Sequence, residues 1–113
     1  MRGICVNIVT STEAYTKKIK AIVEESGCFT FSLKNLAEWD KHSECKLEIL
    51  IVEDRILMEP PNILSLRQIL VSYSLPVMIV SQTTEGLQNT LSYPRSIQLD
   101  ELPAAIKFAS QQI

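Results

Sequence analysis

The chain has 113 residues, with 11 basic and 13 acidic side chains, a formal net charge of −2 and 46% apolar residues. These values fit one compact domain spanning residues 1–113. They exclude the basic excess that direct binding to nucleic acid or to an anionic membrane usually requires. The sequence has no run of about 20 apolar residues and no charged leader followed by an apolar core. We therefore expect a cytoplasmic protein.

Short β-branched runs alternate with helical patterns along the chain, as in a parallel sheet with helices on both faces. Several runs are apolar almost throughout, which is typical of strands buried on both sides. We predict an α/β fold in three layers, α/β/α, with five parallel strands. The predicted strands are residues 3–9, 28–33, 47–52, 77–80 and 96–99.

The segment after the first predicted strand has a strong helical pattern. Thr10 and Glu13 have the spacing of a helix capping box, in which each side chain bonds to the other residue's backbone amide. Apolar residues then recur every three or four positions until Gly27, which ends the predicted helix. A second, short helix is expected over residues 35–41.

Two adjacent prolines mark the start of the third predicted helix. Pro60 and Pro61 each disfavour helix in the residue before them, so we expect the helix to begin later, with Asn62 as its cap. A short helix is then expected up to residue 91, and a last helix capped by Asp100.

The three cysteines, Cys5, Cys28 and Cys45, are widely spaced. No two of them have the C-x-x-C spacing of a zinc-binding motif. We expect buried, reduced thiols that pack as small apolar side chains. His42 is the single histidine and lies in a polar stretch, so the sequence supports neither a metal site nor a catalytic triad. We expect no metal and no cofactor.

The carboxyl ends of parallel strands are where ligands bind in open α/β sheets. After the first strand, Thr10, Ser11 and Thr12 form a turn rich in hydroxyl groups, next to a predicted helix N-terminus that offers unpaired amides to an anion. No glycine is present there to shape a phosphate cradle. Helix capping and an anion-facing turn both remain open. Glu53, Asp54 and Arg55 follow the third strand, and Ser81 follows the fourth.

This arrangement resembles the receiver domain of two-component response regulators, a family with a flavodoxin-like fold and strand order 2-1-3-4-5. The best local match runs from LEILIVED (47–54) to LPVMIVS (75–81). The resemblance implies an acceptor aspartate after the third strand and a Ser or Thr after the fourth. It also implies two acidic metal ligands after the first strand and a lysine after the fifth.

Only part of that set is present in this sequence. Glu53 takes the acceptor position if ILIV is matched directly, and Asp54 takes it with a shift of one residue; Ser81 matches the hydroxyl position. No acidic pair follows the first strand, and Gln98 or Leu99 stands where the lysine belongs. Phosphoryl transfer to a carboxylate needs a divalent cation and a fixed cation near the phosphate. The chain therefore resembles a degenerate receiver, or pseudo-receiver, that is not an enzyme.

Charged side chains are concentrated in the first half of the chain. Of the 24 charged residues, 18 lie in residues 1–61, which leaves 6 in residues 62–113. An uncharged surface with exposed Leu and Tyr suits protein–protein contact. The resemblance points to the same side, because the fourth helix, fifth strand and fifth helix of receivers commonly form the partner face. The residues predicted for this face are Leu87, Leu91, Tyr93 and Ile106.

These observations predict a non-catalytic regulatory module within a signalling or transcription regulator. It is expected to bind another protein domain or a second copy of itself, and to contact neither nucleic acid nor membrane. Two alternatives remain open. One is a phosphorylatable receiver that uses Asp54 or Glu53 with unusual metal ligands, and the other is a flavodoxin-like binder of an anionic small molecule at the strand ends.

Overall fold

The computed structural model describes residues 3–40, 44–81 and 98–111. In this part of the chain, four parallel strands form one sheet in the order β2-β1-β3-β4, so the protein is an α/β protein. The two central strands are buried along nearly their whole length, which explains why their sequences are apolar without alternation. The strands are β1 (Ile4–Val9), β2 (Phe29–Leu33), β3 (Leu47–Glu53) and β4 (Val77–Val80).

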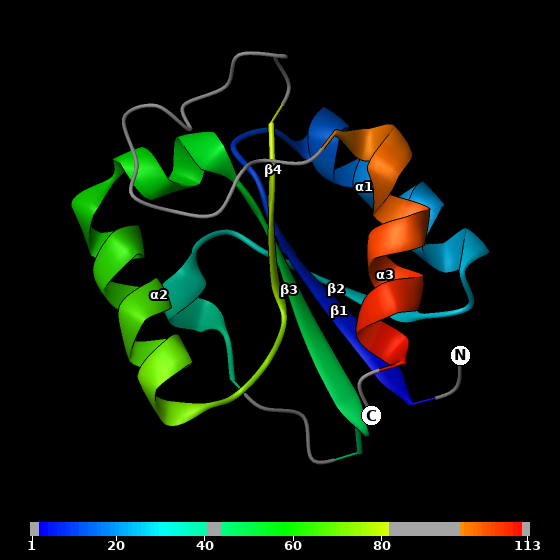
Figure 1. Cartoon of the computed structure of the whole chain (residues 1–113). Helices are drawn as coiled ribbons and strands as arrows, with labels where there is room; N and C mark the ends of the chain where they lie inside the picture. Colours follow the sequence, from blue (N-terminus) through cyan, green and yellow to red (C-terminus); the bar gives the residue numbers. More distant parts are fainter. Residues whose placement is uncertain (1–2, 41–43, 82–97, 112–113) are drawn as a thin grey trace.

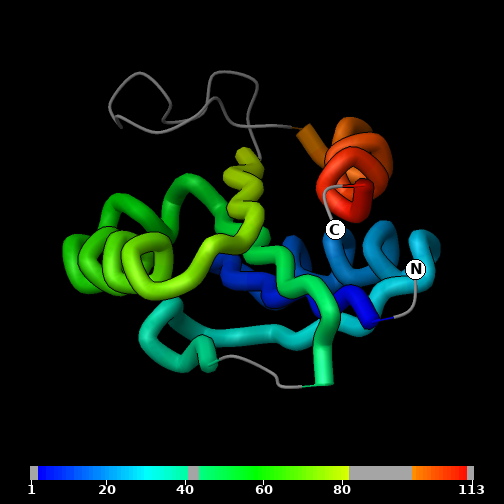
Figure 2. The backbone as a smooth tube through the Cα atoms, turned by 60° about the horizontal axis from the view of Figure 1, so that its bottom comes forward, coloured from blue at the N-terminus to red at the C-terminus, as the bar shows by residue number. Residues whose placement is uncertain are grey.

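Helices cover both faces of the sheet (Figure 1). Helices α1 (Glu13–Glu25) and α3 (Leu102–Ser110) pack on one face, and α2 (Pro60–Ser72) packs on the other. Figure 2 shows the same separation from a second direction, with α1 and α3 together and α2 apart from them. Three 3₁₀ turns complete the described elements: η1 (Leu36–Glu38), η2 (Asp54–Met58) and η3 (Leu99–Glu101). The short helix predicted over residues 35–41 is thus a single 3₁₀ turn, η1.

Successive side chains of each strand point to opposite faces of the sheet. Ile49 and Ile51 of β3 pack with α1 and α3, whereas Leu50 and Val52 pack with α2. Glu53 continues the first series and therefore lies on the α1 face. The other face carries Cys5 and two buried polar side chains, Asn7 of β1 and Glu48 of β3. Among the described helices, none is long and apolar enough to cross a membrane.

The predicted fifth strand is not part of the described sheet. Leu99 begins the turn η3, and residues 96–97 lie outside the described residues, as does the short helix predicted up to residue 91. Gln98 and Glu101 form a capping box, in which the amide of Gln98 donates to Oε1 of Glu101 at 3.2 Å. This local pairing turns the chain into a helical conformation at the point where we predicted an extended one.

The predicted caps of three helices also differ from the structure. Asp100 lies inside η3 and does not cap the last helix. Helix α1 is capped by Thr12, whose Oγ1 accepts from the amide of Tyr15 at 3.2 Å, and not by Thr10. Thr10 donates instead to the carbonyl oxygen of Thr12 at 2.6 Å. Residues 10 and 11 connect the end of β1 to α1. The residue that caps α1 is therefore two positions later than predicted.

Helix α2 begins at the two prolines, contrary to our expectation that they delay it. Pro60 and Pro61 occupy its first turn, where backbone amides have no acceptor within the helix and a missing N–H costs little. Asn62 is buried and is not a cap. Its Oδ1 accepts from the amide of Leu36 at 3.2 Å, and its Nδ2 donates to Oε2 of Glu59 at 2.9 Å. Asn62 therefore links α2 to η1.

The expectation of three reduced thiols is wrong for two of the cysteines. Cys5 and Cys45 form a disulfide with their Cα atoms 6.0 Å apart. Cys5 lies in β1 opposite Glu48 of β3, and Cys45 shortly precedes β3, so the pairing of neighbouring strands brings the two sulfurs together. Cys28 is free and buried, and burial raises the pKa of its thiol.

Candidate functional site

The candidate site lies at the carboxyl ends of β1, β3 and β4, where the parallel strands end at one edge of the sheet. In the register of β3 and β4, Glu53 pairs with Val80, so Ser81 follows directly at the neighbouring strand end. The turn after β1 brings Ser11 to the same edge, within hydrogen-bond distance of Glu53. The sheet topology therefore assembles three side chains that are up to 70 residues apart in sequence.

Glu53 is the last residue of β3 and is completely buried. Its Oε1 accepts two hydrogen bonds from Ser11, one from the backbone amide at 2.7 Å and one from the hydroxyl at 2.6 Å. Hydrogen bonds to a charged acceptor are short and strong, and they offset the loss of hydration that burial causes. The loop after β1 is thereby fixed to the end of β3.

Asp54 is the first residue of η2, and only 3% of its surface is exposed. Glu53 thus occupies the strand end itself, and Asp54 lies one step beyond it in the turn. Two carboxylates from consecutive residues are therefore buried at the end of a central strand. Within the described residues, no group of three or more His, Cys, Asp or Glu side chains is arranged to hold a metal ion.

Tyr15 is part of this site, although the sequence pattern placed it only on the apolar face of a helix. The residue is buried, and its hydroxyl has no hydrogen-bond partner among the described residues. Burial, together with the negative charges of Glu53 and Asp54, raises the pKa of Tyr15 to about 12. The phenol therefore stays neutral at physiological pH. The signal in the sequence was a tyrosine in the first turn of the helix that follows β1, close to the strand ends.

A pocket of about 160 Å³ opens beside these groups. Tyr15 and Lys18 line it from α1, and Ser81 lines it from the end of β4. Lys18 is a cation that the sequence analysis missed, because the resemblance directed attention to the segment after the fifth strand. The spacing of three residues from Tyr15 to Lys18 places both on one side of a helix. The remaining lining residues are Gln98 and Leu99.

The hydroxyl groups of the turn after β1 bond within the protein. Thr12 caps α1, Ser11 bonds to Glu53, and Thr10 bonds to the Thr12 carbonyl and to the hydroxyl of Thr16 at 2.6 Å. A pocket of about 540 Å³ adjoins this turn. Its basic lining residues are Lys17, Lys20 and Lys34, and Glu13 also contributes to it.

The predicted partner face is wrong at the residue that the structure describes. Ile106 is fully buried and packs in the core shared by α1, α3 and the sheet. Helix α3 places Ile106 inward, and Phe108, two positions further, is 67% exposed because it lies on the opposite side. The other predicted residues, Leu87, Leu91 and Tyr93, lie outside the described residues.

Exposed apolar side chains gather instead on α2. Val71 is 88% exposed, and Leu64, seven residues earlier and therefore on the same side of the helix, is also exposed. Leu70 adds a third exposed apolar side chain to this helix. The buried apolar residues of the helix are Leu66 and Ile69.

The fold and this site define an α/β domain with a parallel sheet and buried carboxylates at the end of a central strand. No protein-family model matches the chain, and comparisons with curated proteins and with solved structures give no match. The function is therefore argued from the geometry of the site.

Proposed function

We propose that the chain is a pseudo-receiver, a non-catalytic regulatory module of flavodoxin-like fold within a signalling or transcription regulator. It acts by binding another protein domain or a second copy of itself. The observation that carries this proposal is the contact between Ser11 and Glu53, in which one carboxylate oxygen accepts hydrogen bonds from both the amide and the hydroxyl.

A phospho-acceptor carboxylate must reach the phosphorus atom of a donor while a cation neutralises the phosphate oxygens. Glu53 is completely buried, and its Oε1 is held by Ser11. The protein's own N–H and O–H groups stabilise the negative charge at this position. A permanent carboxylate, instead of a reversible phosphoryl group, then occupies the strand end.

Exposed apolar side chains support action through protein contact. Val71 and Leu64 on α2, and Phe108 on α3, are each more than half exposed. Large exposed apolar side chains are common at protein–protein contacts, because binding of a partner removes them from water. These helices lie on opposite faces of the sheet, so the domain offers two separate contact surfaces (Figure 1).

The second candidate function is a phosphorylatable receiver that uses Asp54. One observation favours it, namely that Lys18 lines the same pocket as Ser81. The resemblance implies a lysine after the fifth strand, whereas this lysine comes from α1. The candidate ranks second because Asp54 is 3% exposed and the turn after β1 has no acidic pair to hold Mg²⁺.

Phosphorylation with a small donor separates the two candidates. The full chain is incubated with Mg²⁺ and acetyl phosphate, and its intact mass is measured with Asp54→Asn and Glu53→Gln variants as controls. We expect no phosphoryl adduct on the wild-type chain. A stoichiometric adduct that Asp54→Asn abolishes would overturn the proposal and establish the second candidate.

A further inference from the structure

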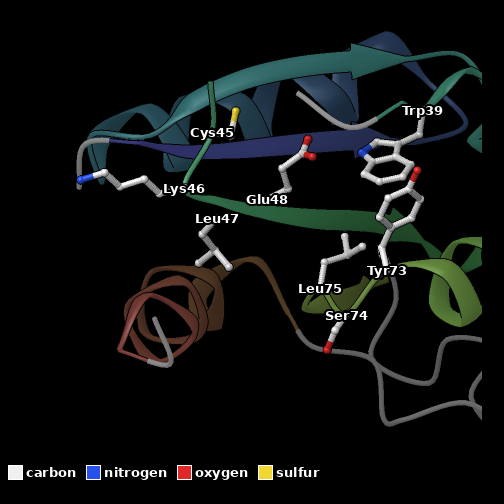
Figure 3. A pocket seen from close by; sticks show the side chains of 8 residues that line it. All are labelled: Trp39, Cys45, Lys46, Leu47, Glu48, Tyr73, Ser74 and Leu75. Carbon is white, nitrogen blue, oxygen red and sulfur yellow. The ribbon is translucent and has the colours of Figure 1, made fainter. Parts of the chain in front are cut away.

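The Cys5–Cys45 disulfide lies at the amino end of the sheet, far from the candidate site. Its two sulfurs have different surroundings. Cys5 is 3% exposed within β1, whereas Cys45 is partly exposed and lines a pocket of about 180 Å³ (Figure 3). Of the two bonded residues, Cys45 is therefore the one that a small molecule in the pocket can reach.

The pocket has a mixed lining that suits a small polar molecule. Figure 3 shows Glu48 between Cys45 on one side and the aromatic pair Trp39 and Tyr73 on the other. The two rings are in edge contact, with their centroids 5.0 Å apart. The indole Nε1 of Trp39 is buried and has no hydrogen-bond partner among the described residues, so it can donate to an incoming molecule.

We propose that the Cys5–Cys45 disulfide is a redox-sensitive modification site, at which low-molecular-weight thiols enter this pocket and attack the sulfur of Cys45. This inference is independent of the proposed function. The intermediate between the oxidised and reduced forms of the chain is then a mixed disulfide between Cys45 and the small thiol.

The exchange proceeds in two steps. A thiolate attacks Sγ of Cys45 and forms a new S–S bond, while the Cys5–Cys45 bond breaks and leaves its electron pair on Cys5, which takes a proton from solvent. A second thiolate then attacks the small-thiol sulfur of the mixed disulfide and releases Cys45, which is also protonated. In total, two thiols lose two electrons and two protons to the protein and leave as one small disulfide.

Burial of Cys5 determines which sulfur leaves and which is attacked. An attacking thiolate needs an approach in line with the breaking bond, and the core around β1 offers none to Cys5. Once released, the thiol of Cys5 packs as a small apolar side chain among buried neighbours. Cys45 stays at the pocket wall in both forms, so it is the residue that a small disulfide would modify again on reoxidation.

Native alkylation of the full chain tests the assignment. The oxidised chain is reduced with dithiothreitol without denaturant, and N-ethylmaleimide labelling of each cysteine is followed by peptide mass spectrometry. We expect Cys45 to be labelled at least about tenfold faster than Cys5, because thiol reactivity follows exposure. The fluorescence of Trp39, the single tryptophan, should change with the same redox midpoint as the disulfide.

Two further measurements keep the proposal open to refutation. A Cys5→Ser variant treated with glutathione disulfide should carry one glutathione on Cys45, and a Cys28→Ala variant of the otherwise unchanged chain should keep the wild-type redox midpoint. Equal labelling rates at Cys5 and Cys45 would overturn the proposal. So would reduction that proceeds only at the rate of global unfolding, measured in parallel by urea-jump kinetics.

Discussion

The two ends of the sheet hold their polar groups in different ways. At the carboxyl end, Glu53 accepts two hydrogen bonds of 2.6 and 2.7 Å from Ser11. At the amino end, Asn7 donates to Oε1 of Glu48 at 3.4 Å, and its Oδ1 is buried without a partner among the described residues. The amino end instead has a covalent bond, the disulfide.

This difference indicates how each end is stabilised. Short bonds to a charged acceptor hold the carboxyl end even though no covalent link is present there. The side-chain contact between Asn7 and Glu48 is long and contributes less. The disulfide adds a covalent link to the backbone bonds at the start of β3, where the amides of Lys46 and Leu47 donate to the carbonyl oxygen of Gly3 at 2.7 and 3.1 Å. Removing these elements one at a time should show whether the contrast between the two ends remains.

Loss of the disulfide should have the largest effect. The bond joins residues 40 positions apart, and closing a loop of that length stabilises a protein by about 3–4 kcal/mol through the entropy of the unfolded chain. We expect Cys45→Ser to lower the free energy of urea unfolding by about this amount, and Cys28→Ala to have a smaller effect. If reductant leaves the wild-type urea midpoint unchanged, the amino end does not depend on the bond.

Removing the Ser11 hydroxyl should have the next largest effect. Ser11→Ala deletes one of the two hydrogen bonds to a buried carboxylate, a loss of about 1.5–3 kcal/mol in the free energy of unfolding. Ser32→Ala, at an exposed position of β2, is the matched control and should change stability by less than about 0.5 kcal/mol. Equal effects of the two substitutions would contradict the importance of the Ser11 contact.

Tyr15→Phe should change stability at neutral pH by no more than about 1 kcal/mol, because the hydroxyl has no partner among the described residues. The effect should appear at high pH. Burial and the nearby carboxylates raise the pKa of Tyr15 from 10.0 to about 12, so the folded chain holds this proton more tightly than the unfolded chain does.

Wild-type stability should therefore be unaffected by this group below pH 10 and fall as the pH rises from 10 to about 12. The Tyr15→Phe variant should lack that part of the decline when both chains are unfolded in urea across this range. Parallel pH profiles for the two proteins would show that neither burial nor the nearby carboxylates raise the pKa of Tyr15 in the folded chain.

Val71→Glu should have the smallest effect on stability, because Val71 is 88% exposed. It tests the proposed contact through α2. If the chain pairs with a second copy there, sedimentation should show a concentration-dependent mass that Val71→Glu reduces. Ala21→Glu adds the same charge at an exposed position of α1, on the other face of the sheet, and serves as the control. Wild-type association that Val71→Glu leaves unchanged would place the contact elsewhere.

The strands were predictable from the sequence because burial on both faces requires apolar runs. Residues 77–80 were predicted as they are found, and the central strands were predicted within one residue at each end. The order 2-1-3-4 that the resemblance implies for the first four strands is also found in the described sheet. Helix starts were less predictable, because Pro60 and Pro61 are compatible with both a late start and a first helical turn.

The site was predictable only in part. Strand ends indicated Glu53, Asp54 and Ser81, since the end of an apolar run is visible in sequence. The involvement of Tyr15 and Lys18 depends on how α1 is rotated about its axis, which periodicity alone fixes only to within one side of a helix.

The predictions for Cys5 and Cys45 and for Ile106 were wrong for a related reason. Cys5 and Cys45 meet because β1 and β3 are neighbours in the sheet, and their spacing in the sequence carries no sign of it. Ile106 was assigned to the partner face from the composition and the resemblance, whereas the packing of α3 buries it in the core. Both depend on tertiary contacts that a linear pattern does not contain.

The bond from the backbone amide of Ser11 to Glu53 also affects how this site can change in evolution. Every residue except proline has a backbone N–H. One of the two hydrogen bonds to Glu53 therefore depends on the backbone conformation and not on the side chain at position 11. Position 11 can therefore drift among many amino acids while the carboxylate keeps one donor. Among relatives of this protein, the glutamate and the exclusion of proline would persist longer than the serine.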